Sequence, residues 1–429
     1  MTQEPETTLI NGKQVNILDS HKSNPSYRTQ KQQVFIVGSK GIPAAYGGFE
    51  TFVENLTRYQ QSDGIRYHVS RLAHDDRRYE YNRAKCFNVE VADVGAGRSV
   101  FYDLKALRQC IEYCRQRPSI KHPVFYVLAC RIGPFIGHYK KQIRKLGGVL
   151  YVNPDGHEWM RSKWSLPVRR YWKWSERLMV KHSDLVICDS VNIEKYIREE
   201  YAKYKPQTKY ISYGSDTRIS SVSDDDPAYT EWMKKHNITP MDYYLVVCRL
   251  VPENNFETII REFMKSDTMK KLVIVATKNR NFGRKLRRTL QYEKDPRIRF
   301  VGTVYDSELL KKIRENAYAY IHGHEVGGTN PSLLEALQCT KLNLLYQVGF
   351  NEEVAKDSAR YWTKESGNLA RLIHEADRMP DEVRETLSVK AKARIDQAYR
   401  WKDIVDRYET LFMNTGDGIG EDSDDSQLS

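Results

Sequence analysis

The sequence predicts a parallel α/β protein built from two domains of similar size. Its 429 residues exceed what a single hydrophobic core usually holds. Apolar runs of strand length alternate with amphipathic helical stretches, a pattern typical of parallel sheets covered by helices. A hydrophilic stretch at 215–229 interrupts this alternation, which then restarts. We therefore expect two successive Rossmann-like halves joined by a linker.

The expected strands and helices alternate through both halves. In the first half, strands are expected at 34–38, 68–73, 89–94, 124–129, 149–153, 185–189 and 209–213, with helices that include 49–60, 100–117 and 134–146. In the second half, strands are expected at 243–248, 272–276, 298–301, 319–322 and 342–346, with helices that include 255–264, 332–338 and 369–376.

A final helix at 401–412 has an apolar face made of Ile404, Val405, Tyr408, Leu411 and Phe412. We expect this helix to cross back and pack against the N-terminal domain. The predicted organisation is an N-terminal tail with room for one short strand (1–30), two Rossmann-like domains (31–220 and 221–398), a crossing helix (399–414) and a disordered acidic tail (415–429).

The composition indicates a globular protein. Hydrophobic residues make up 40% and charged residues 29%, and no apolar run reaches the roughly 18 residues of a bilayer span. The polar, acidic start lacks the features of a signal peptide. The cysteines are odd in number, and Cys110 and Cys114, the only close pair, have no histidine nearby to complete a zinc site. We expect reduced, mostly packed thiols and a cytoplasmic location.

The formal net charge of +12 predicts an anionic partner. Nucleotides, nucleic acids and the anionic inner face of a membrane all fit such a charge. The net charge alone does not distinguish among these partners, so the sequence motifs are needed to do so.

A glycine-rich loop follows the first strand of the N-terminal domain. Gly38, Gly41, Gly47 and Gly48 lie between that strand and the helix 49–60, where a backbone without side chains can approach a ligand closely. The start of the helix offers free N–H groups to an anion. The spacing is not G-x-G-x-x-G and no acidic residue ends the second strand, so the loop only weakly indicates dinucleotide binding. The alternative is a tight turn that packs the helix on the strand.

A second loop, VGGTNPSLLEAL, occupies residues 326–337. Backbone N–H groups and a hydroxyl suited to a diphosphate stand at the start of its helix, in Gly327, Gly328, Thr329 and Asn330. Glu335 lies about one turn further on, where its carboxylate can accept hydrogen bonds from two ribose hydroxyls. The alternative is a capped helix with a solvated glutamate.

Two more segments follow expected strands. Arg249 stands at a strand end, facing the crevice where open α/β sheets bind ligands, and its guanidinium suits a phosphate. In the segment 151–164, Asp155, His157 and Glu158 offer acid/base groups or contacts to sugar hydroxyls. A solvated arginine and a simple Asp-Gly turn are the structural alternatives.

Together these segments resemble the bacterial glycosyltransferases of family 4, which have the GT-B fold. The similarity rests on four blocks, VGSKGIPAAYGGFETFVENL, NPDGHEWMRSKW, RLVPENN and HGHEVGGTNPSLLEAL, and covers roughly residues 32–412. Within the family the blocks are most similar to streptococcal capsular β-1,4-rhamnosyltransferases and their relatives. The resemblance implies two Rossmann-like domains facing a cleft, with the donor nucleotide bound mainly by the C-terminal domain and the acceptor by the N-terminal one.

The resemblance also implies roles for single residues. Glu335 would hold the ribose and Arg249 the diphosphate, and the backbone of 328–330 would hold phosphate or sugar. Asp155 and His157 would face the transferred sugar or the acceptor hydroxyl. The N-terminal wall of the cleft would include Gly47 and Gly48, in the loop that also holds Gly41.

Two positions depart from the family pattern. The family has two glutamates eight positions apart, but the position eight before Glu335 is Gly327. Glu325 or His324 is therefore the candidate for holding the sugar. A lysine usually follows the phosphate arginine by five positions, where this chain has Asn254; we expect Lys278, after the next strand, to supply the missing charge.

The implied reaction retains the configuration of the sugar and needs neither metal nor cofactor. The only acidic run comparable to a metal-binding Asp-x-Asp, at 224–226, lies in the linker. We expect Arg249, a helix dipole and Lys278 to offset the charge of the leaving diphosphate, which helps to deprotonate the acceptor. The resemblance implies dTDP-β-L-rhamnose as the donor.

Basic and aromatic residues are interleaved after the fourth block. The aromatic ones are Trp159, Trp164, Tyr171, Trp172 and Trp174, and the basic ones Arg161, Lys163, Arg169, Arg170, Lys173, Arg177 and Lys181. Such a mixture suits an anionic membrane surface. We expect peripheral contact with the inner face of the cell membrane and a polyprenyl-diphosphate-linked saccharide as acceptor. A core helix with packed tryptophans and solvated arginines is the alternative.

Other protein classes explain less of the sequence. No helix-turn-helix, zinc or RNA-binding signature accompanies the charge, so we expect no nucleic-acid partner. A Rossmann oxidoreductase explains the first glycine-rich loop but not the second half. A transferase that uses a UDP- or GDP-sugar, and a non-catalytic relative that only binds nucleotide sugars, remain as alternatives.

Overall fold

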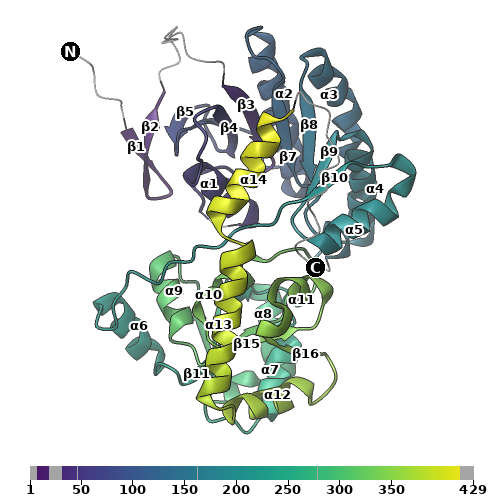
Figure 1. Cartoon of the computed structure of the whole chain (residues 1–429). Helices are drawn as coiled ribbons and strands as arrows, with labels where there is room; N and C mark the ends of the chain where they lie inside the picture. The colour runs from purple at the N-terminus through teal and green to yellow at the C-terminus, as the bar shows by residue number, and fades with distance from the viewer. Residues whose placement is uncertain (1–6, 19–30, 46, 162, 278, 416–429) are drawn as a thin grey trace, which may run out of the picture.

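The computed structural model describes residues 7–18, 31–45, 47–161, 163–277 and 279–415. Two α/β domains lie one above the other, the N-terminal domain at the top of Figure 1 and the C-terminal domain at the bottom. Both contain parallel sheets with helices on both faces, so the expected two-domain fold is confirmed. The predicted acidic tail lies outside the described residues, apart from residue 415.

The N-terminal sheet has the strand order β1-β2-β5-β6-β4-β3-β7-β8-β9-β10. Its strands are β1 (Thr7–Ile10), β2 (Lys13–Ile17), β3 (Gln32–Val37), β4 (Ile65–Leu72), β5 (Arg78–Tyr81), β6 (Ala84–Val89), β7 (Val124–Leu128), β8 (Val149–Asn153), β9 (Leu185–Cys188) and β10 (Thr208–Tyr210). Seven of them run parallel from β6 to β10, while β1, β2 and β5 form an antiparallel edge.

Two predictions in this domain are wrong. Residues 7–17, expected to belong to a tail, form a β1–β2 hairpin that pairs with β5. Its turn is Asn11-Gly12, both with positive φ, as a two-residue hairpin of this type requires. The strand expected at 89–94 runs instead from Ala84 to Val89. Its apolar residues alternate between the cores on the two faces of the sheet, Ala84 and Cys86 on one and Phe87 and Val89 on the other, and the polar Lys85 and Asn88 interrupt them in the sequence.

Helices cover both faces of this sheet. The face that carries Phe35 and Phe125 is covered by α2 (Arg98–Arg115), α3 (Gly133–Lys145) and α4 (Leu166–His182). The opposite face is covered by α1 (Gly48–Arg58) and by the last helix of the chain, α14 (Trp401–Met413). A further helix, α5 (Val191–Glu200), follows β9 and packs against it.

The C-terminal sheet is parallel throughout, in the order β13-β12-β11-β14-β15-β16. Its strands are β11 (Tyr243–Arg249), β12 (Lys271–Thr277), β13 (Ile298–Gly302), β14 (Ala319–His322), β15 (Asn343–Tyr346) and β16 (Arg360–Trp362). One face packs against α7 (Phe256–Lys265), α8 (Arg280–Leu290) and α12 (Asn368–Asp377). The remaining helices are α6 (Pro227–His236), α9 (Ser307–Glu315), α10 (Pro331–Cys339), α11 (Gly349–Ala355) and α13 (Asp381–Ala398).

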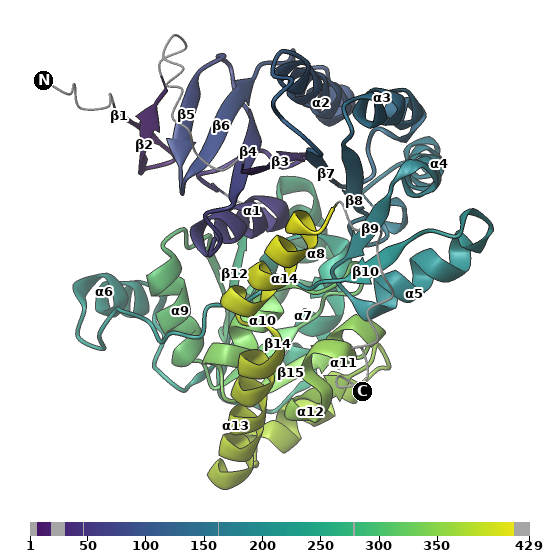
Figure 2. The same ribbon diagram turned by 45° about the horizontal axis from the view of Figure 1, so that its top comes forward.

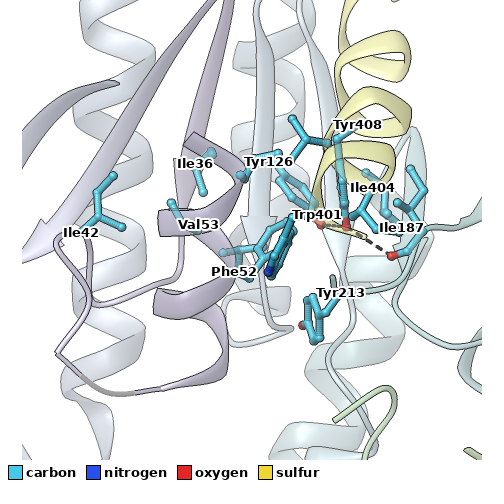
Figure 3. Close-up of a cluster of buried hydrophobic side chains, with 14 of the residues drawn as sticks. Ile36, Ile42, Phe52, Val53, Tyr126, Ile187, Tyr213, Trp401, Ile404 and Tyr408 are labelled. Carbon is cyan, nitrogen blue, oxygen red and sulfur yellow. Dashed lines mark hydrogen bonds between the residues drawn. The ribbon is translucent and has the colours of Figure 1, made fainter. Parts of the chain in front are cut away.

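The chain returns to the N-terminal domain through α13 and α14, as expected (Figure 2). Figure 3 shows Trp401 and Tyr408 of α14 among Phe52, Tyr126 and other buried side chains of the N-terminal domain. The Tyr126 and Tyr408 hydroxyls lie 3.3 Å apart. The core of the N-terminal domain therefore contains residues from both ends of the chain.

Two further expectations concern the whole chain. All seven cysteines are free thiols and five are buried, as expected. In the described ranges, no helix combines the length and the apolar character needed to cross a bilayer.

Candidate functional site

The loops after β8 and β14 meet where the two domains face each other. A Cβ placed on Gly156 would lie 2.3 Å from Cα of Gly327 and 2.7 Å from the backbone nitrogen of Gly328. Only backbone without side chains permits this approach. Two of the sequence motifs, 171 positions apart, are therefore in direct contact.

The loop after β8 has an unusual backbone. Asp155 and His157, on either side of Gly156, have φ values of 59° and 44°. Residues with side chains rarely adopt this left-handed conformation, and such strain gathers at functional sites. The backbone nitrogen of Asp155 donates to Oδ1 of the buried Asn153, 2.8 Å away, which helps to hold the turn.

His157 is fixed by an aromatic cluster. Its ring centroid lies 4.2 Å from that of Tyr196, whose hydroxyl donates to Glu176. The Lys173 ammonium stands 4.6 Å from the Trp159 ring and 4.8 Å from the Tyr196 ring. Burial, reinforced by Lys173, lowers the pKa of His157. The imidazole is therefore neutral near pH 7 and can exchange hydrogen bonds with a sugar hydroxyl.

Asp155 and Glu158 share one arginine. Arg161 lies 2.5 Å from Glu158 and 3.8 Å from Asp155. Glu158 also pairs with Lys163 and accepts a hydrogen bond from Nε1 of Trp164. Burial opposes ionisation of Glu158, but its cationic partners lower its pKa overall. Burial raises the pKa of Asp155, so this carboxyl ionises less readily than that of Glu158.

Asp189, at the end of β9, is a site residue that was not singled out from the sequence. Its side chain is buried, and its Oδ1 would lie 2.1 Å from a Cβ on Gly328. Its backbone oxygen accepts a hydrogen bond from the Thr329 hydroxyl. Burial, and then Asp155 and Glu353, raise the pKa of Asp189 to about 8. The group is therefore mostly protonated at neutral pH and belongs to the contact between the domains.

The C-terminal side of the site is organised by Asn254. Its Nδ2 donates to the backbone oxygen of Arg249 at 2.6 Å, and its Oδ1 lies 2.8 Å from Nδ1 of His324. The amide oxygen assigns the ring proton of His324 to Nδ1 and leaves Nε2 as an acceptor. Burial, followed by His322 and nearby arginines, lowers the pKa of His324. Asn254 thus shapes the loop and does not replace the charge of a lysine.

Arg249 is exposed at the end of β11. Within the described ranges, no side chain forms an ion pair or hydrogen bond with its guanidinium. It can therefore hold a phosphate. Lys278, expected to assist it, lies outside the described residues.

Glu325 is already engaged. Its carboxylate pairs with Lys364 and accepts a hydrogen bond from Nδ2 of Asn255 at 3.0 Å. Its backbone nitrogen donates to the oxygen of Glu253. A sugar hydroxyl would share this carboxylate with a lysine.

The start of α10 offers a ligand mainly backbone N–H groups, because the polar side chains there bind other groups of the protein. Asn330 caps the helix by accepting a hydrogen bond from the Ser332 nitrogen at 2.9 Å, and the Thr329 hydroxyl is taken by Asp189. An anion at this end would meet N–H groups and the helix dipole. Further along, Glu335 pairs with the buried Arg314 at 2.6 Å but is 42% exposed, so it remains accessible to a ligand.

The N-terminal glycine loop is bound to its own domain. Gly41 would place a Cβ 2.4 Å from Cβ of Arg71, and Gly47 would place one 1.9 Å from the Glu50 carboxylate. Both have positive φ. Gly48 has open space around it at the start of α1. The atoms nearest to a Cβ on Gly41 or Gly47 thus belong to the N-terminal domain, and Gly38 lies against the backbone of Leu128.

Several of the basic and aromatic side chains around α4 contact other groups of the protein. Lys173 lies among aromatic rings, Arg161 and Lys163 pair with Glu158, and Arg169 donates to the backbone oxygen of Trp159. Trp174 is 46% exposed. This segment therefore offers fewer free charges than its sequence indicates.

A second link joins the domains at the start of α5. The carboxylate of Glu353, on α11, accepts hydrogen bonds from the Ser190 hydroxyl and from the Val191 and Asn192 nitrogens, at 2.7–3.2 Å. Asn192 also donates through Nδ2 at 2.8 Å. An acidic side chain of one domain thus caps a helix of the other, at its positive end.

We expect Glu353→Ala to lower the free energy of unfolding by about 1 kcal/mol, because the Ser190 hydroxyl and the Val191 nitrogen lose their acceptor while Ser190 still caps the Asn192 nitrogen. Urea denaturation measures this change. Glu352→Ala is the matched control, since Glu352 contacts Gln347 on its own side of the link. Equal losses in both variants would contradict the proposed cap.

In the described part of the chain, no group of three or more His, Cys, Asp or Glu side chains is arranged to hold a metal ion.

Two families match successive parts of the chain. Residues 31–216 match the family described as Domain of unknown function (DUF1972), and residues 228–394 match Glycosyl transferases group 1. The boundary between the matches falls in the hydrophilic stretch expected to be a linker. No curated protein matches the chain.

Solved structures share the whole two-domain arrangement. Sucrose-phosphate synthase from Thermosynechococcus elongatus is 17% identical, with a TM-score of 0.71 over 90% of this chain and 99% of that one. A glycosyltransferase from Rickettsia africae is 11% identical, with a TM-score of 0.68 over 90% and 99%. Anabaena HepE, in complex with UDP, is 13% identical, with a TM-score of 0.64 over 89% and 100%. These similarities confirm the expected GT-B fold.

Proposed function

We propose that this chain, in which residues 228–394 form a glycosyl transferases group 1 domain, is a glycosyltransferase that moves a sugar from a nucleotide diphosphate donor to a saccharide acceptor. The contact of the Asp155-Gly156-His157 loop with Gly327 and Gly328 carries the proposal. The proposal is supported because Asp155 and His157 of one domain flank a glycine that touches the loop before α10 of the other domain, and the start of that helix suits an anion.

In this proposal the C-terminal domain holds the donor. The diphosphate lies between Arg249 and the start of α10, where a guanidinium and helix N–H groups stabilise its charge. Glu335 accepts hydrogen bonds from the ribose hydroxyls while Arg314 holds its second oxygen. Residues of the loop before α10 contact the sugar through their backbone, and His324 offers Nε2.

The N-terminal domain supplies the groups on the other side of the sugar. His157 is neutral and fixed against Tyr196, so it can orient a hydroxyl without adding charge. Asp155 faces the same contact and is held by Arg161. We assign both to binding the transferred sugar or the acceptor hydroxyl. The departing diphosphate takes up the acceptor proton, and the configuration of the sugar is retained.

More specifically, we propose that this transferase is a rhamnosyltransferase. We propose dTDP-β-L-rhamnose as donor, without a metal, and a polyprenyl-diphosphate-linked saccharide as acceptor at the inner face of the cell membrane, in the synthesis of a surface polysaccharide. The resemblance of the four sequence blocks supports this choice. A UDP-sugar is the second candidate, because structures of the similar HepE contain UDP and UDP-glucose.

The first test is thermal stabilisation by dTDP, UDP, GDP and their sugars in the presence of EDTA. A ligand at about 100 times its Kd stabilises the native protein by about 2.7 kcal/mol, which shifts Tm by several degrees. We expect the largest shift with dTDP and dTDP-rhamnose. A larger shift with UDP-glucose would replace the donor assignment, and no shift with any nucleotide would contradict the proposed function.

Glu335→Gln is expected to weaken donor binding at least about tenfold, because hydrogen bonds to a charged group contribute about 1.5–3 kcal/mol. Glutamine can still accept the Arg314 hydrogen bond, so the fold is preserved. Calorimetric titration with the nucleotide measures the loss. Glu385→Gln, on α13 beside Lys341, is the control and should bind normally.

A further inference from the structure

The outer face of α8 is the most strongly basic helix surface of the C-terminal domain. This helix carries five basic residues and no acidic one, and its apolar residues Phe282, Leu286 and Leu290 pack against the domain core. The basic residues are Arg280, Arg284, Lys285, Arg287 and Arg288, all exposed.

Most of these charges are available to a partner. Arg287 pairs with Glu293 at 2.9 Å. For the other four, the described residues provide no ion pair and no hydrogen-bond acceptor. Uncompensated like charges on adjacent helical turns repel each other, so their gathering lowers stability unless an external anion is present.

Exposed aromatic side chains lie on the strand and the loop that follow α8 in the chain. Phe300, on the edge strand β13, lies against Tyr292, which follows the helix; the ring centroids are 4.9 Å apart. Tyr305 is 80% exposed. It lies two residues after Thr303, whose hydroxyl donates to the backbone oxygen of Ala276 near the end of β12, shortly before α8 begins.

We propose that this α8 surface, comprising Arg280, Arg284, Lys285, Arg288, Phe300 and Tyr305, docks the protein on an anionic lipid bilayer. A convex helix with spread charges suits an extended anionic surface rather than a single bound ion. Aromatic side chains beside the basic ones suit the boundary between headgroups and acyl chains. The choice of a bilayer rests on the lipid-linked acceptor of the proposed function.

The position of α8 agrees with such a role. It begins directly after β12, at the carboxyl edge of the sheet, which is also where β11 ends with Arg249. Its five basic residues are all exposed, so its outer face is uncovered. A bilayer bound there would lie close to the donor side of the domain contact.

Co-sedimentation with vesicles tests the proposal. The variant R280Q/R284Q/K285Q/R288Q is compared with R108Q/K141Q/R144Q/K145Q, which removes the same charge from exposed residues of α2 and α3. Glutamine keeps helix propensity high in both. The vesicles contain phosphatidylcholine alone, or phosphatidylcholine and phosphatidylglycerol in equal parts.

The wild type and the α2/α3 variant are expected to bind only the vesicles with phosphatidylglycerol. The α8 variant should bind them at least about 100-fold more weakly, since each basic residue near an anionic surface contributes severalfold to partitioning. F300S/Y305S should also bind more weakly. Equal binding by the two charge variants, or no binding by the wild type, would overturn the proposal.

Two further measurements separate this proposal from its premise. Nucleotide-induced thermal shifts of the α8 variant should equal those of the wild type, because Arg249 and Glu335 are intact. If the wild type sedimented with anionic vesicles but bound no nucleotide, the proposed function would be contradicted. The assignment of the α8 surface to lipid binding would still stand. Release from the vesicles by a short RNA at much lower concentration than by excess free lipid would assign the surface to nucleic acid instead.

Discussion

Gly156→Ala is expected to reduce kcat/KM for sugar transfer by about 100-fold, the equivalent of about 2.7 kcal/mol of lost transition-state stabilisation. The new Cβ would lie 2.3 Å from Cα of Gly327, so the two loops must separate. Separation would move Asp155 and His157 away from the donor side, and displacements of about 1 Å are enough for losses of this size. Steady-state kinetics with the nucleotide sugar identified by thermal shifts measures the effect.

Gly97→Ala is the control. Its Cβ would meet the Phe101 ring at 3.5 Å, an ordinary contact outside the site. Its kcat/KM should equal that of the wild type. If Gly156→Ala kept full activity with unchanged Tm, the contact between the loops would not be part of the active arrangement.

Asp189→Asn is expected to flatten the pH dependence of stability. The pKa of Asp189 is raised to about 8, above the ordinary value of 3.8, so the native protein holds a proton that the unfolded chain releases. Its contribution is fully present below about pH 4 and is lost as the pH rises through about 8. The slope is about 1.4 kcal/mol per pH unit, and the total between about pH 5 and about pH 8 is at most about 4 kcal/mol. The amide keeps the shape and cannot ionise.

Tm measured from about pH 5 to about pH 9 tests this prediction. The variant should resemble the wild type at the acidic end and exceed it increasingly toward the alkaline end. Asp63→Asn, which alters a carboxylate with 86% side-chain exposure, should leave the slope unchanged. Parallel curves for the wild type and Asp189→Asn would show that Asp189 does not titrate in this range.

The sequence predicts the sheets well because buried parallel strands are continuously apolar. Segments such as 124–128 and 243–249 stand out against their surroundings. The β1–β2 hairpin was missed although Asn11-Gly12 is a strong hairpin signal. Its strands are short and mostly exposed, and each contains only two apolar residues, too few for a clear alternating pattern.

The candidate site was only partly predictable. Asp155, His157, Arg249 and Glu335 could be proposed from the sequence because each lies after a strand or in the early turns of a helix within a recognisable block. Asp189 also ends a strand, and β9 is the neighbour of β8, so adjacent strand ends could have indicated a pair with Asp155. The role of Glu353 depends on how the two domains pack, and no local sequence pattern predicts that packing.

The sequence likewise could not predict which candidate side chains form hydrogen bonds within the protein. The hydroxyl of Thr329 was expected to face a diphosphate, but it donates to the backbone oxygen of Asp189. The side chain of Asn330 caps its own helix, as the structural alternative had it. Both are polar residues in a loop, and only three-dimensional neighbours decide whether such groups face a ligand or the protein.

The return of α14 to the N-terminal domain sets the order in which the chain can fold during translation. Phe52 and Tyr126 leave the ribosome early, but Trp401 and Tyr408, which complete their packing, are made only after the whole C-terminal domain. The carboxylate of Glu409 likewise caps the nitrogens of Gln61 and Ser62. The C-terminal domain is therefore complete in sequence before the N-terminal core can close, whereas domains usually fold in the order in which they are made.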